Sequence, residues 1–181
     1  LEKEGSNINF SLISPITNEL KIDQSLSHNG VCLTVVDVSE GSYTVTAVKE
    51  TLEKSNLTLL EVGSKVNIER SIKIGGRIDG HIVQGHVDQR GVCTHIKKYN
   101  GSHILTFEYE LSNNITVEKG SVCVNGVSLT VINSKENAFS VTIIPYTFEH
   151  TNLHTIKEGS VVNIEFDILG KYIARMFIKE S

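Results

Sequence analysis

The seven residues Asn125-Gly126-Val127-Ser128-Leu129-Thr130-Val131 decide the fold, because the chain carries nearly the same stretch earlier as Asn29-Gly30-Val31-Cys32-Leu33-Thr34-Val35. The two stretches are 96 residues apart, and the match continues at this spacing without a gap. Further matches join Thr51, Glu53, Asn56 and Leu57 to Thr147, Glu149, Asn152 and Leu153, and Gly63-Ser64 and Val66-Asn67-Ile68-Glu69 to Gly159-Ser160 and Val162-Asn163-Ile164-Glu165. Shared composition would explain one short match, but not a gapless run that mixes Glu, Asn, Leu and Gly. The sequence therefore predicts an internal duplication, whose halves are called copy one and copy two.

Length and composition narrow the class of protein. A chain of 181 residues with this repeat predicts two domains of a little under 100 residues each. Its 39% hydrophobic and 21% charged residues are typical of a soluble globular protein, and no apolar run is long enough to cross a bilayer. The net charge of -4, with dispersed Lys and Arg, argues against a nucleic-acid partner.

The three cysteines, Cys32, Cys93 and Cys123, are odd in number and form no Cys-x-x-Cys motif. This usage favours a reducing compartment over a disulfide framework. No signal peptide is recognised at Leu1. We expect a cytoplasmic protein, and the removal of an organelle-targeting peptide stays open.

Periodicity predicts two small β domains. Strands are expected at 8–13, 31–37, 42–48 and 66–72 in copy one, and at 103–109, 122–132, 139–144 and 161–168 in copy two. Short helical turns are expected at 49–57 and 148–152, where Glu, Lys and Leu replace β-branched residues. Strands of this length with turns every 8 to 12 residues favour a closed or nearly closed antiparallel barrel, with a sandwich as the alternative.

Two segments have no counterpart in the repeat. The connector at 75–88 is rich in glycine, but it lacks both the Gly-Lys-Ser/Thr ending and the Gly-x-Gly-x-x-Gly spacing of phosphate-binding loops. In the tail, apolar residues recur at helical spacing: Leu169, Tyr172, Ile173, Met176 and Phe177. This amphipathic helix is expected either to cap its own barrel or, as we favour, to form a subunit contact.

Strand alternation places small polar groups on one face of each copy. Ser128 and Thr130 share one face in copy two, and Cys32 and Thr34 share the equivalent face in copy one. The face is either a ligand site or an ordinary solvated surface. Cys32 is either a nucleophile or an inert thiol, and nothing in its local sequence argues for a lowered pKa.

The titratable residues offer few further candidates. The only His/Asp cluster is His81, His86, Asp88 and His95, in which His86 and Asp88 would share a face as strand residues. No metal site is expected, because the spacing is not that of metal ligands, whereas a single His beside a pocket suits proton transfer. His28, His150 and His154 are expected to be surface or loop residues. Lys119 and Asp167 are isolated charges, and Asp167 aligns with Ser71, which would give the copies different roles.

Five stretches together give the chain a family resemblance. They are Gly85-His86-Val87-Asp88, the two Asn-Gly repeats quoted above, Lys49-Glu50-Thr51-Leu52 and Ile144-Pro145-Tyr146-Thr147-Phe148-Glu149. These motifs lie in the family's order in both copies, and the chain resembles the riboflavin synthase family over essentially its whole length. The resemblance implies an all-β fold of two tandem six-stranded Greek-key barrels plus a C-terminal α-helix. The corresponding domains are 1–80, 81–168 and a trimerisation helix at 169–181.

The resemblance also implies an activity. Two molecules of 6,7-dimethyl-8-ribityllumazine exchange a four-carbon unit to give riboflavin and 5-amino-6-ribitylamino-2,4(1H,3H)-pyrimidinedione. No cofactor or metal is implied. The implied partners are these ligands, the other subunits of a homotrimer, and lumazine synthase. Two similar pockets, from the N-terminal barrel of one subunit and the C-terminal barrel of the next, would hold the two reactants.

The residues implied to form these pockets are carried over one by one. The first pocket would contain Ser25, Cys32, Leu33, Thr34, Thr46, Ala47, Val48, Lys49, Glu50 and Thr51. The second would contain Lys119, Ser128, Leu129, Thr130, Thr142, Ile143, Ile144, Pro145, Tyr146, Thr147 and Asp167, with Gly85, His86 and Val87 at its entrance. Candidates for proton transfer and nucleophilic addition at lumazine C7 are His86, Cys32, Ser128, Thr34 and Thr130, with Asp167 as a copy-specific carboxylate.

One departure from the family pattern concerns the start of copy one. The family begins Met-Phe-Thr-Gly, the counterpart of residues 82–85, and subtracting 96 places this stretch before Leu1. The sequence given thus lacks the expected first strand, about fifteen residues on the repeat spacing. Either these residues were cut off or left out, or the protein is a genuine truncation, in which case the first barrel would be open and activity doubtful. The rival function is a non-catalytic lumazine- or flavin-binding protein of the same fold, such as an optical antenna.

Overall fold

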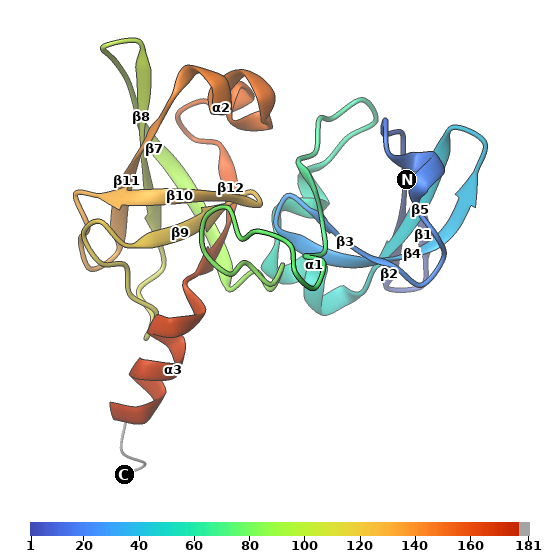
Figure 1. Ribbon diagram of the computed structural model, residues 1–181, viewed down its shortest axis with the longest axis horizontal. Coiled ribbons are helices and arrows are strands. Elements are labelled where there is room, and N and C mark those ends of the chain that lie inside the picture. The colour runs from blue at the N-terminus through green and yellow to red at the C-terminus, as the bar shows by residue number, and fades with distance from the viewer. Residues whose placement is uncertain (178–181) are drawn as a thin grey trace.

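A computed structural model describes residues 1–177 of the chain. The two copies form two β units that lie side by side, and a C-terminal helix projects from copy two (Figure 1). Copy one contains β1 (Glu2–Glu4), β2 (Asn7–Leu12), β3 (Ser25–His28), β4 (Val31–Ser39), β5 (Ser42–Ala47) and β6 (Ile68–Arg70), with η1 (Thr17–Glu19), α1 (Lys49–Lys54) and η2 (Asn56–Leu59) between them. Copy two contains β7 (Gln89–Tyr99), β8 (Ser102–Tyr109), β9 (Ser121–Val124), β10 (Val127–Ile132), β11 (Ala138–Ile143) and β12 (Val161–Phe166), with α2 (Pro145–His150) and η3 (Asn152–Thr155), followed by α3 (Ile168–Phe177).

Copy two closes into a barrel in the order β10-β11-β8-β7-β12-β9. In copy one the strands follow the order β1-β2-β5-β4-β3-β6, in which each strand has the same neighbours as its counterpart in copy two. The two end strands, β1 and β6, do not pair with each other. The closing contact of copy two joins Gln89–Val92 of β7 to Val161–Ile164 of β12, and subtracting 96 places the β7 counterparts before Leu1. The predicted all-β fold of two six-stranded units plus a helix is confirmed, with the first unit open along this line.

The core of each unit follows the alternation seen in the sequence. In β4 the side chains of Val31, Leu33 and Val35 are buried, whereas Cys32 is half-buried and Thr34 is exposed. The inward residues pack with aromatic partners, which are Phe10 and Tyr43 in copy one. The corresponding core of copy two contains Phe107, Phe139 and Phe166. Each copy therefore has its own core, and the outer face of β4 and of β10 is left available for other contacts.

Within 122–132, Asn125 and Gly126 turn the chain with positive φ angles of 47° and 82°, so this segment forms the hairpin of β9 and β10. Two local predictions need correction. The strand expected at 66–72 is limited to β6. His28 was expected at the surface, but it is 2% exposed. Its Nε2 lies 2.9 Å from the Tyr43 hydroxyl and its Nδ1 lies 3.0 Å from the Leu26 carbonyl oxygen.

The two copies meet through six asparagines related by the repeat: Asn29, Asn56 and Asn67, and their counterparts Asn125, Asn152 and Asn163. The Asn56 amide N–H donates to Asn163 Oδ1 at 2.6 Å, and the equivalent bond from Asn152 to Asn67 Oδ1 is 2.7 Å. The Asn67 and Asn163 side chains each donate at 2.8 Å to a backbone carbonyl of the opposite copy, at Asn125 and Asn29. These hydrogen bonds are related by an approximate twofold symmetry. They anchor η2 of copy one on β12 of copy two, and η3 of copy two on the segment that leads into β6.

The C-terminal helix is confirmed, although residues 178–181 of the range expected to carry it lie outside the described residues. Lys171 Nζ forms an ion pair with Asp88 Oδ2 at 2.7 Å, which ties α3 to its own barrel. Five apolar residues of the helix are between 56% and 83% exposed: Leu169, Tyr172, Ile173, Met176 and Phe177. A helix that capped its own barrel would bury this stripe, so the stripe is available for another molecule.

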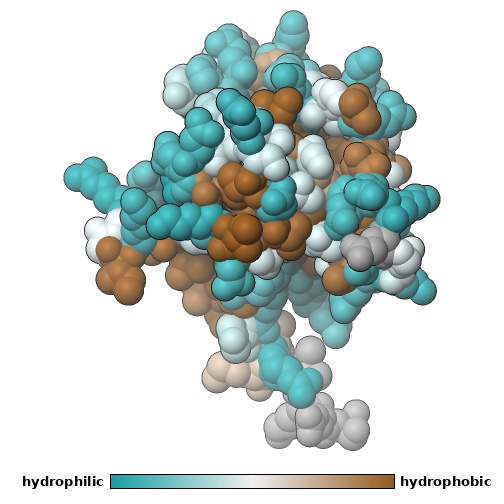
Figure 2. All heavy atoms as spheres, turned by 90° about the vertical axis from the view of Figure 1, so that its right-hand side faces the viewer, coloured by the Kyte–Doolittle hydropathy of each residue, from teal (hydrophilic) through white to brown (hydrophobic). Residues whose placement is uncertain are grey.

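Other exposed apolar side chains are spread over the surface. Copy one exposes Ile13, Val36 and Val62, among others. The side of the molecule shown in Figure 2 carries small apolar groups set among hydrophilic side chains. No helix in the described part of the chain is long and apolar enough to cross a membrane.

Candidate functional site

A cavity of about 920 Å³ lies between the two copies, within the range of small-molecule sites. Copy one contributes β3, β6 and Cys32, whereas copy two contributes the start of β10 and the segment α2–η3. The connector covers part of it with Arg77, Asp79, His81 and Gly85. The cavity thus belongs to neither copy alone.

A second pocket, of about 270 Å³, lies on copy one beside α1. Its lining includes Glu50 and Thr51 of α1 and His86 of the connector. Cys32 and Gly85 line both this pocket and the larger cavity. The two hollows therefore adjoin at Cys32, on the outer face of β4.

The polar faces predicted from strand alternation are confirmed. Cys32 and Ser128 are half-buried, and Thr34 and Thr130 are exposed beside them. Thr34 precedes Val35, which pairs with Val45 of β5, and Thr130 precedes Val131, which pairs with Val141 of β11. In an antiparallel pair this register places Thr46 and Thr142 on the same outer surfaces. Each copy thus carries a small polar patch on equivalent strands.

The remaining predicted site residues fall into three groups. Those that line a cavity are Ser25, Cys32, Glu50, Thr51, Gly85, His86, Val87, Ser128, Tyr146 and Thr147. Those whose side chains point into a barrel core, and which offer only backbone groups, are Leu33, Ala47, Leu129 and Ile143. Those outside the lining of both hollows are Thr34, Thr46, Val48, Lys49, Lys119, Thr130, Thr142, Ile144, Pro145 and Asp167.

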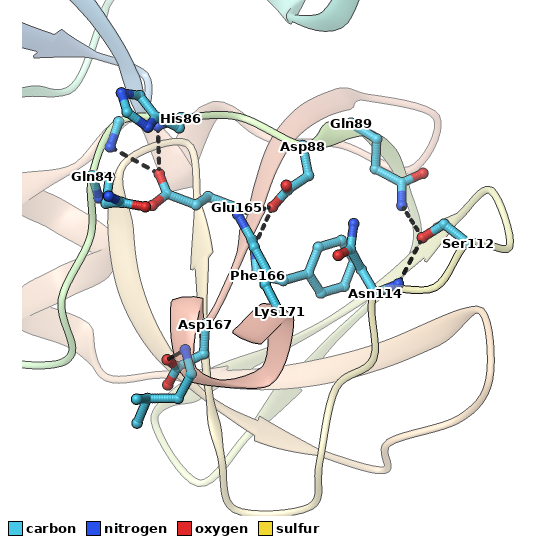
Figure 3. A network of polar contacts seen from close by, with 12 residues as sticks. Gln84, His86, Asp88, Gln89, Ser112, Asn114, Glu165, Phe166, Asp167 and Lys171 are labelled. Atoms are coloured by element: carbon cyan, nitrogen blue, oxygen red, sulfur yellow. Dashed lines mark hydrogen bonds and ion pairs between the residues drawn. The ribbon is translucent and has the colours of Figure 1, made fainter. Parts of the chain in front are cut away.

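A buried carboxylate that the sequence reasoning did not single out holds the connector in place. Glu165 in β12 is 2% exposed. Its Oε1 accepts the backbone N–H of Gln84 at 2.7 Å, and its Oε2 accepts those of Gly85 and His86, both at 2.9 Å (Figure 3). Three N–H donors satisfy the charge without a cation. The only available signal was the repeated Val-Asn-Ile-Glu stretch, which also contains Glu69.

The anchored connector then reaches copy one. The Gly85 carbonyl oxygen accepts the Cys32 backbone N–H at 2.8 Å. A Cβ atom on Gly85 would lie 2.7 Å from Cys32 Cβ, and the Gly85 φ angle is +80°. Only glycine fits this approach. Glu165 of copy two thereby positions the chain against the thiol-bearing strand of copy one.

Two carboxylates next to this network, Asp167 and Asp88, interact with α3 or with the strand that leads into it. Asp167 Oδ1 accepts the Leu169 N–H at 3.0 Å, at the helix N-terminus, and Asp88 Oδ2 accepts the Phe166 N–H at 2.9 Å (Figure 3). The expectation that His86 and Asp88 share a strand face is wrong, because residues 81–88 lie outside all strands. His86 instead lines the smaller pocket, and Asp88 turns toward Lys171.

An imidazole contacts the polar face of copy two. His81 Nδ1 lies 2.7 Å from Ser128 Oγ, and the His81 backbone N–H donates to the same oxygen at 3.3 Å. Partial burial lowers the pKa of His81, and the charges of Asp167 and Glu165 oppose this shift. The sequence had placed His81 only in the loose His/Asp cluster, because Ser128 is 47 residues away.

The thiols of Cys93 and Cys123 are buried and are expected to be unreactive. Burial raises the pKa of Cys93 to about 11 and that of Cys123 to about 12. Both side chains are buried, whereas Cys32 is half-buried beside the cavity. Within residues 1–177, no group of three or more His, Cys, Asp or Glu side chains is arranged to hold a metal ion.

Fold and site together define a class: a tandem β-barrel protein in which equivalent polar faces of two copies border adjoining small-molecule cavities. The family model of the lumazine binding domain matches residues 2–71 and 84–167. The chain belongs to this lumazine-binding family, and within it to the riboflavin synthases, as its relatives show. The riboflavin synthase of Bacillus amyloliquefaciens is 37% identical over 99% of this chain and 84% of its own length. That of Mycobacterium tuberculosis (strain ATCC 25618 / H37Rv) is 40% identical over 89% of this chain and 83% of its own length.

Solved structures agree on the fold. LumP complexed with riboflavin superposes with a TM-score of 0.83 at 22% identity, covering 91% of both chains. LumP complexed with 6,7-dimethyl-8-(1'-D-ribityl) lumazine gives 0.81 at 21% identity, covering 90% of this chain and 89% of LumP. At this sequence identity the structural similarity supports the fold alone, so any conclusion on the chemistry depends on the residues of the site.

Proposed function

We propose that the protein catalyses the riboflavin synthase reaction, the last step of riboflavin biosynthesis. Two molecules of 6,7-dimethyl-8-ribityllumazine react by transfer of a four-carbon unit, which yields riboflavin and 5-amino-6-ribitylamino-2,4(1H,3H)-pyrimidinedione. The observation that carries this proposal is the pair of equivalent faces, with Cys32 and Thr34 on one copy and Ser128 and Thr130 on the other, in a chain that is 37–40% identical to riboflavin synthases.

A duplicated site suits this chemistry because both reactants are the same molecule. Two similar faces bind two lumazines, and fixing their relative orientation replaces a bimolecular encounter by a positioned one. Such positioning is worth up to about 7–11 kcal/mol of the barrier in well-oriented systems. The four-carbon transfer requires no net oxidation or reduction, so the chain's own groups are sufficient in principle and we expect no cofactor.

The cavity residues divide by chemical type. Hydroxyls of Ser25, Thr51 and Thr147 can bond the ribityl chain and the pteridine oxygens, and Tyr146 offers an aromatic face. His86, beside Cys32 at the smaller pocket, is a candidate for removing a proton from the 7-methyl group of lumazine. The exposed Thr34, Thr130 and Thr142, together with the half-buried Thr46, would complete the faces when a second subunit covers them.

The assembly is part of the proposal. We infer a homotrimer in which the exposed stripe of α3 packs against other subunits, and in which the barrels at 1–80 and 81–168 of neighbouring subunits face each other. The helix expected at 169–181 would be the trimerisation element. Lumazine synthase is a proposed further partner, since it would supply the substrate, and the proposed location is the cytoplasm.

The direct test is to mix the purified protein with 6,7-dimethyl-8-ribityllumazine and to follow riboflavin by its absorbance and by chromatography. We expect two lumazines to be consumed for each riboflavin formed. Tight binding of lumazine or riboflavin without turnover would instead support the non-catalytic binding protein. Failure to bind either ligand would reject both functions.

A further inference from the structure

We propose that Tyr146 and His150 of α2 form a stacked aromatic platform in the larger cavity, on which the tricyclic ring of riboflavin binds more tightly than the bicyclic ring of lumazine. The pair would thus determine the ring selectivity of copy two. This role deepens the proposed function and rests on it for the identity of the ligands. α2 lies on the side of copy two that faces copy one (Figure 1), and both residues line the cavity there.

The two rings are held nearly parallel by contacts within α2. Their centroids are 4.0 Å apart and their planes differ by 18°. The residues are four positions apart, which places them on one face of the helix. His150 Nδ1 donates a hydrogen bond to the Tyr146 carbonyl oxygen at 2.8 Å, and this bond fixes the imidazole against the phenol ring. A flat ligand therefore meets an ordered surface and does not have to order it on binding.

The platform leaves room for a ligand. The imidazole stacks on one face of the Tyr146 ring, yet 67% of the residue is exposed. Thr147, the next residue, lines the same cavity with a hydroxyl that can bond a ribityl chain. The opposite wall belongs to copy one and includes Ser25 and Ser27 of β3. A ring stacked on Tyr146 would thus lie between the platform and hydroxyls that can bond its polar edge.

Copy one carries a different pair at the same two positions. Subtracting 96 from Tyr146 and His150 gives Glu50 and Lys54 of α1. Lys54 Nζ lies 2.9 Å from Glu50 Oε1, and both residues line the smaller pocket. A hydrated ion pair has no flat apolar surface on which a ring can stack. Equivalent helix positions therefore border a hollow in each copy, but they offer an aromatic surface in copy two and charges in copy one.

Volume and stacking both favour the larger ring in copy two. The cavity beside Tyr146 has about 920 Å³, whereas the pocket beside Glu50 has about 270 Å³, below the range of about 300–1,000 Å³ of small-molecule sites. Dispersion grows with the number of atoms in contact, and riboflavin has a third fused ring that lumazine lacks. For nucleic-acid bases, loss of one aromatic partner weakens binding by about 5-fold to 150-fold. Riboflavin should therefore compete with lumazine at copy two more strongly than at copy one.

The test measures the affinity of the full chain for each ligand separately: riboflavin by equilibrium dialysis, and lumazine by its fluorescence change on mixing, before turnover. The variant Tyr146→Glu/His150→Lys carries the copy-one pair, whose ion pair keeps a favourable contact on the helix. We expect it to bind riboflavin at least ~10-fold more weakly than wild type, and lumazine no more than about threefold more weakly. Tyr146→Phe keeps the ring and should stay within about twofold of wild type for both ligands.

Tyr99→Glu is the matched control, because Tyr99 is a 55% exposed tyrosine of β7 outside the lining of both hollows, and it should keep wild-type affinities. Unchanged riboflavin affinity in Tyr146→Glu/His150→Lys would overturn the platform, even if the chain makes riboflavin. Equal losses for both ligands would overturn the ring selectivity. If the wild-type chain makes no riboflavin but the variants behave as expected, the proposed enzyme fails and the platform stands. A wild-type chain that binds neither ligand would reject both.

Discussion

Gly30 and Gly126, the glycines of the two repeated Asn-Gly turns, lie against each other at the contact between the copies. A Cβ atom on Gly30 would lie 2.8 Å from the Gly126 backbone nitrogen, and a Cβ atom on Gly126 would lie 2.8 Å from that of Gly30. Both residues have positive φ angles, +81° and +82°. The motif that reveals the duplication is therefore both a hairpin turn within each copy and the point where the copies touch.

Replacing either glycine by alanine should separate these two roles. Gly41 is the matched control, since its φ is also +81° but no atom lies within 4 Å of an added Cβ. The left-handed backbone costs about 1–2 kcal/mol in every variant. Gly30→Ala and Gly126→Ala should lose roughly 1–3 kcal/mol more, because the added carbon overpacks the contact. Urea unfolding measures the difference, and equal losses for Gly30→Ala and Gly41→Ala would contradict the close contact.

The alternation of apolar and polar residues along a strand predicted the site correctly where one face of the strand packs on the core and the other is not covered by the rest of the chain. In β4 the buried Val31, Leu33 and Val35 alternate with the outward Cys32 and Thr34, so sequence spacing alone identified the polar face. The repeat placed the equivalent face on β10. These are short-range properties, and the fold class follows from them.

Alternation fails in β12, where every residue from Val162 to Phe166 is buried. One face of this strand lies on the barrel core, whereas Glu165 is covered by the connector and Asn163 by the other copy. The covering residues are 79 and 107 positions away along the chain. A separation of 47 positions likewise hid the contact of His81 with Ser128. Local sequence carries no signal for such pairs.

Changing Glu165 to Gln should loosen the connector. At least one of the three backbone N–H groups that the carboxylate accepts would then face an NH2 group. The free energy of unfolding should fall by about 2–4 kcal/mol. Riboflavin formation should fall at least tenfold at a temperature where the variant is folded, because Gly85 and His86 are no longer held against Cys32.

The repeat supplies the control for this variant. Glu69 occupies the equivalent position in copy one but is exposed, so Glu69→Gln should change stability by less than about 0.5 kcal/mol. Equal stability changes in the two variants would show that the three hydrogen bonds of Glu165 contribute nothing. Circular dichroism during urea titration measures both.

The buried His28–Tyr43 pair should make stability depend on pH. Burial lowers the pKa of His28 from 6.5 to about 4, so its folded form stays neutral while the unfolded form takes up a proton. The contribution is fully present above pH 6.5 and is lost as the pH falls toward 4. The 2.5-unit difference corresponds to roughly 3 kcal/mol.

Copy two shows how to remove this dependence. Its counterparts of His28 and Tyr43 are Val124 and Phe139, both fully buried. The double variant His28→Val/Tyr43→Phe should therefore lose less stability than wild type between pH 6.5 and 4. Thermal unfolding at several pH values measures the slope, and the same slope in both proteins would remove His28 from the explanation.

The exposed stripe of α3 should decide the oligomeric state. Replacing Leu169, Ile173 and Met176 by Gln keeps good helix formers but removes three apolar side chains that are 67%, 56% and 81% exposed in the single chain. If α3 holds the trimer together, this variant should sediment as a monomer, because the apolar area that drives association is gone. Gly170→Ala is the matched control on the same helix. No atom lies within 4 Å of the added carbon, and the variant should keep the wild-type assembly. Sedimentation velocity separates the outcomes: a trimeric Gln variant would show that the subunits meet elsewhere, and a monomeric wild-type chain would refute the proposed trimer itself.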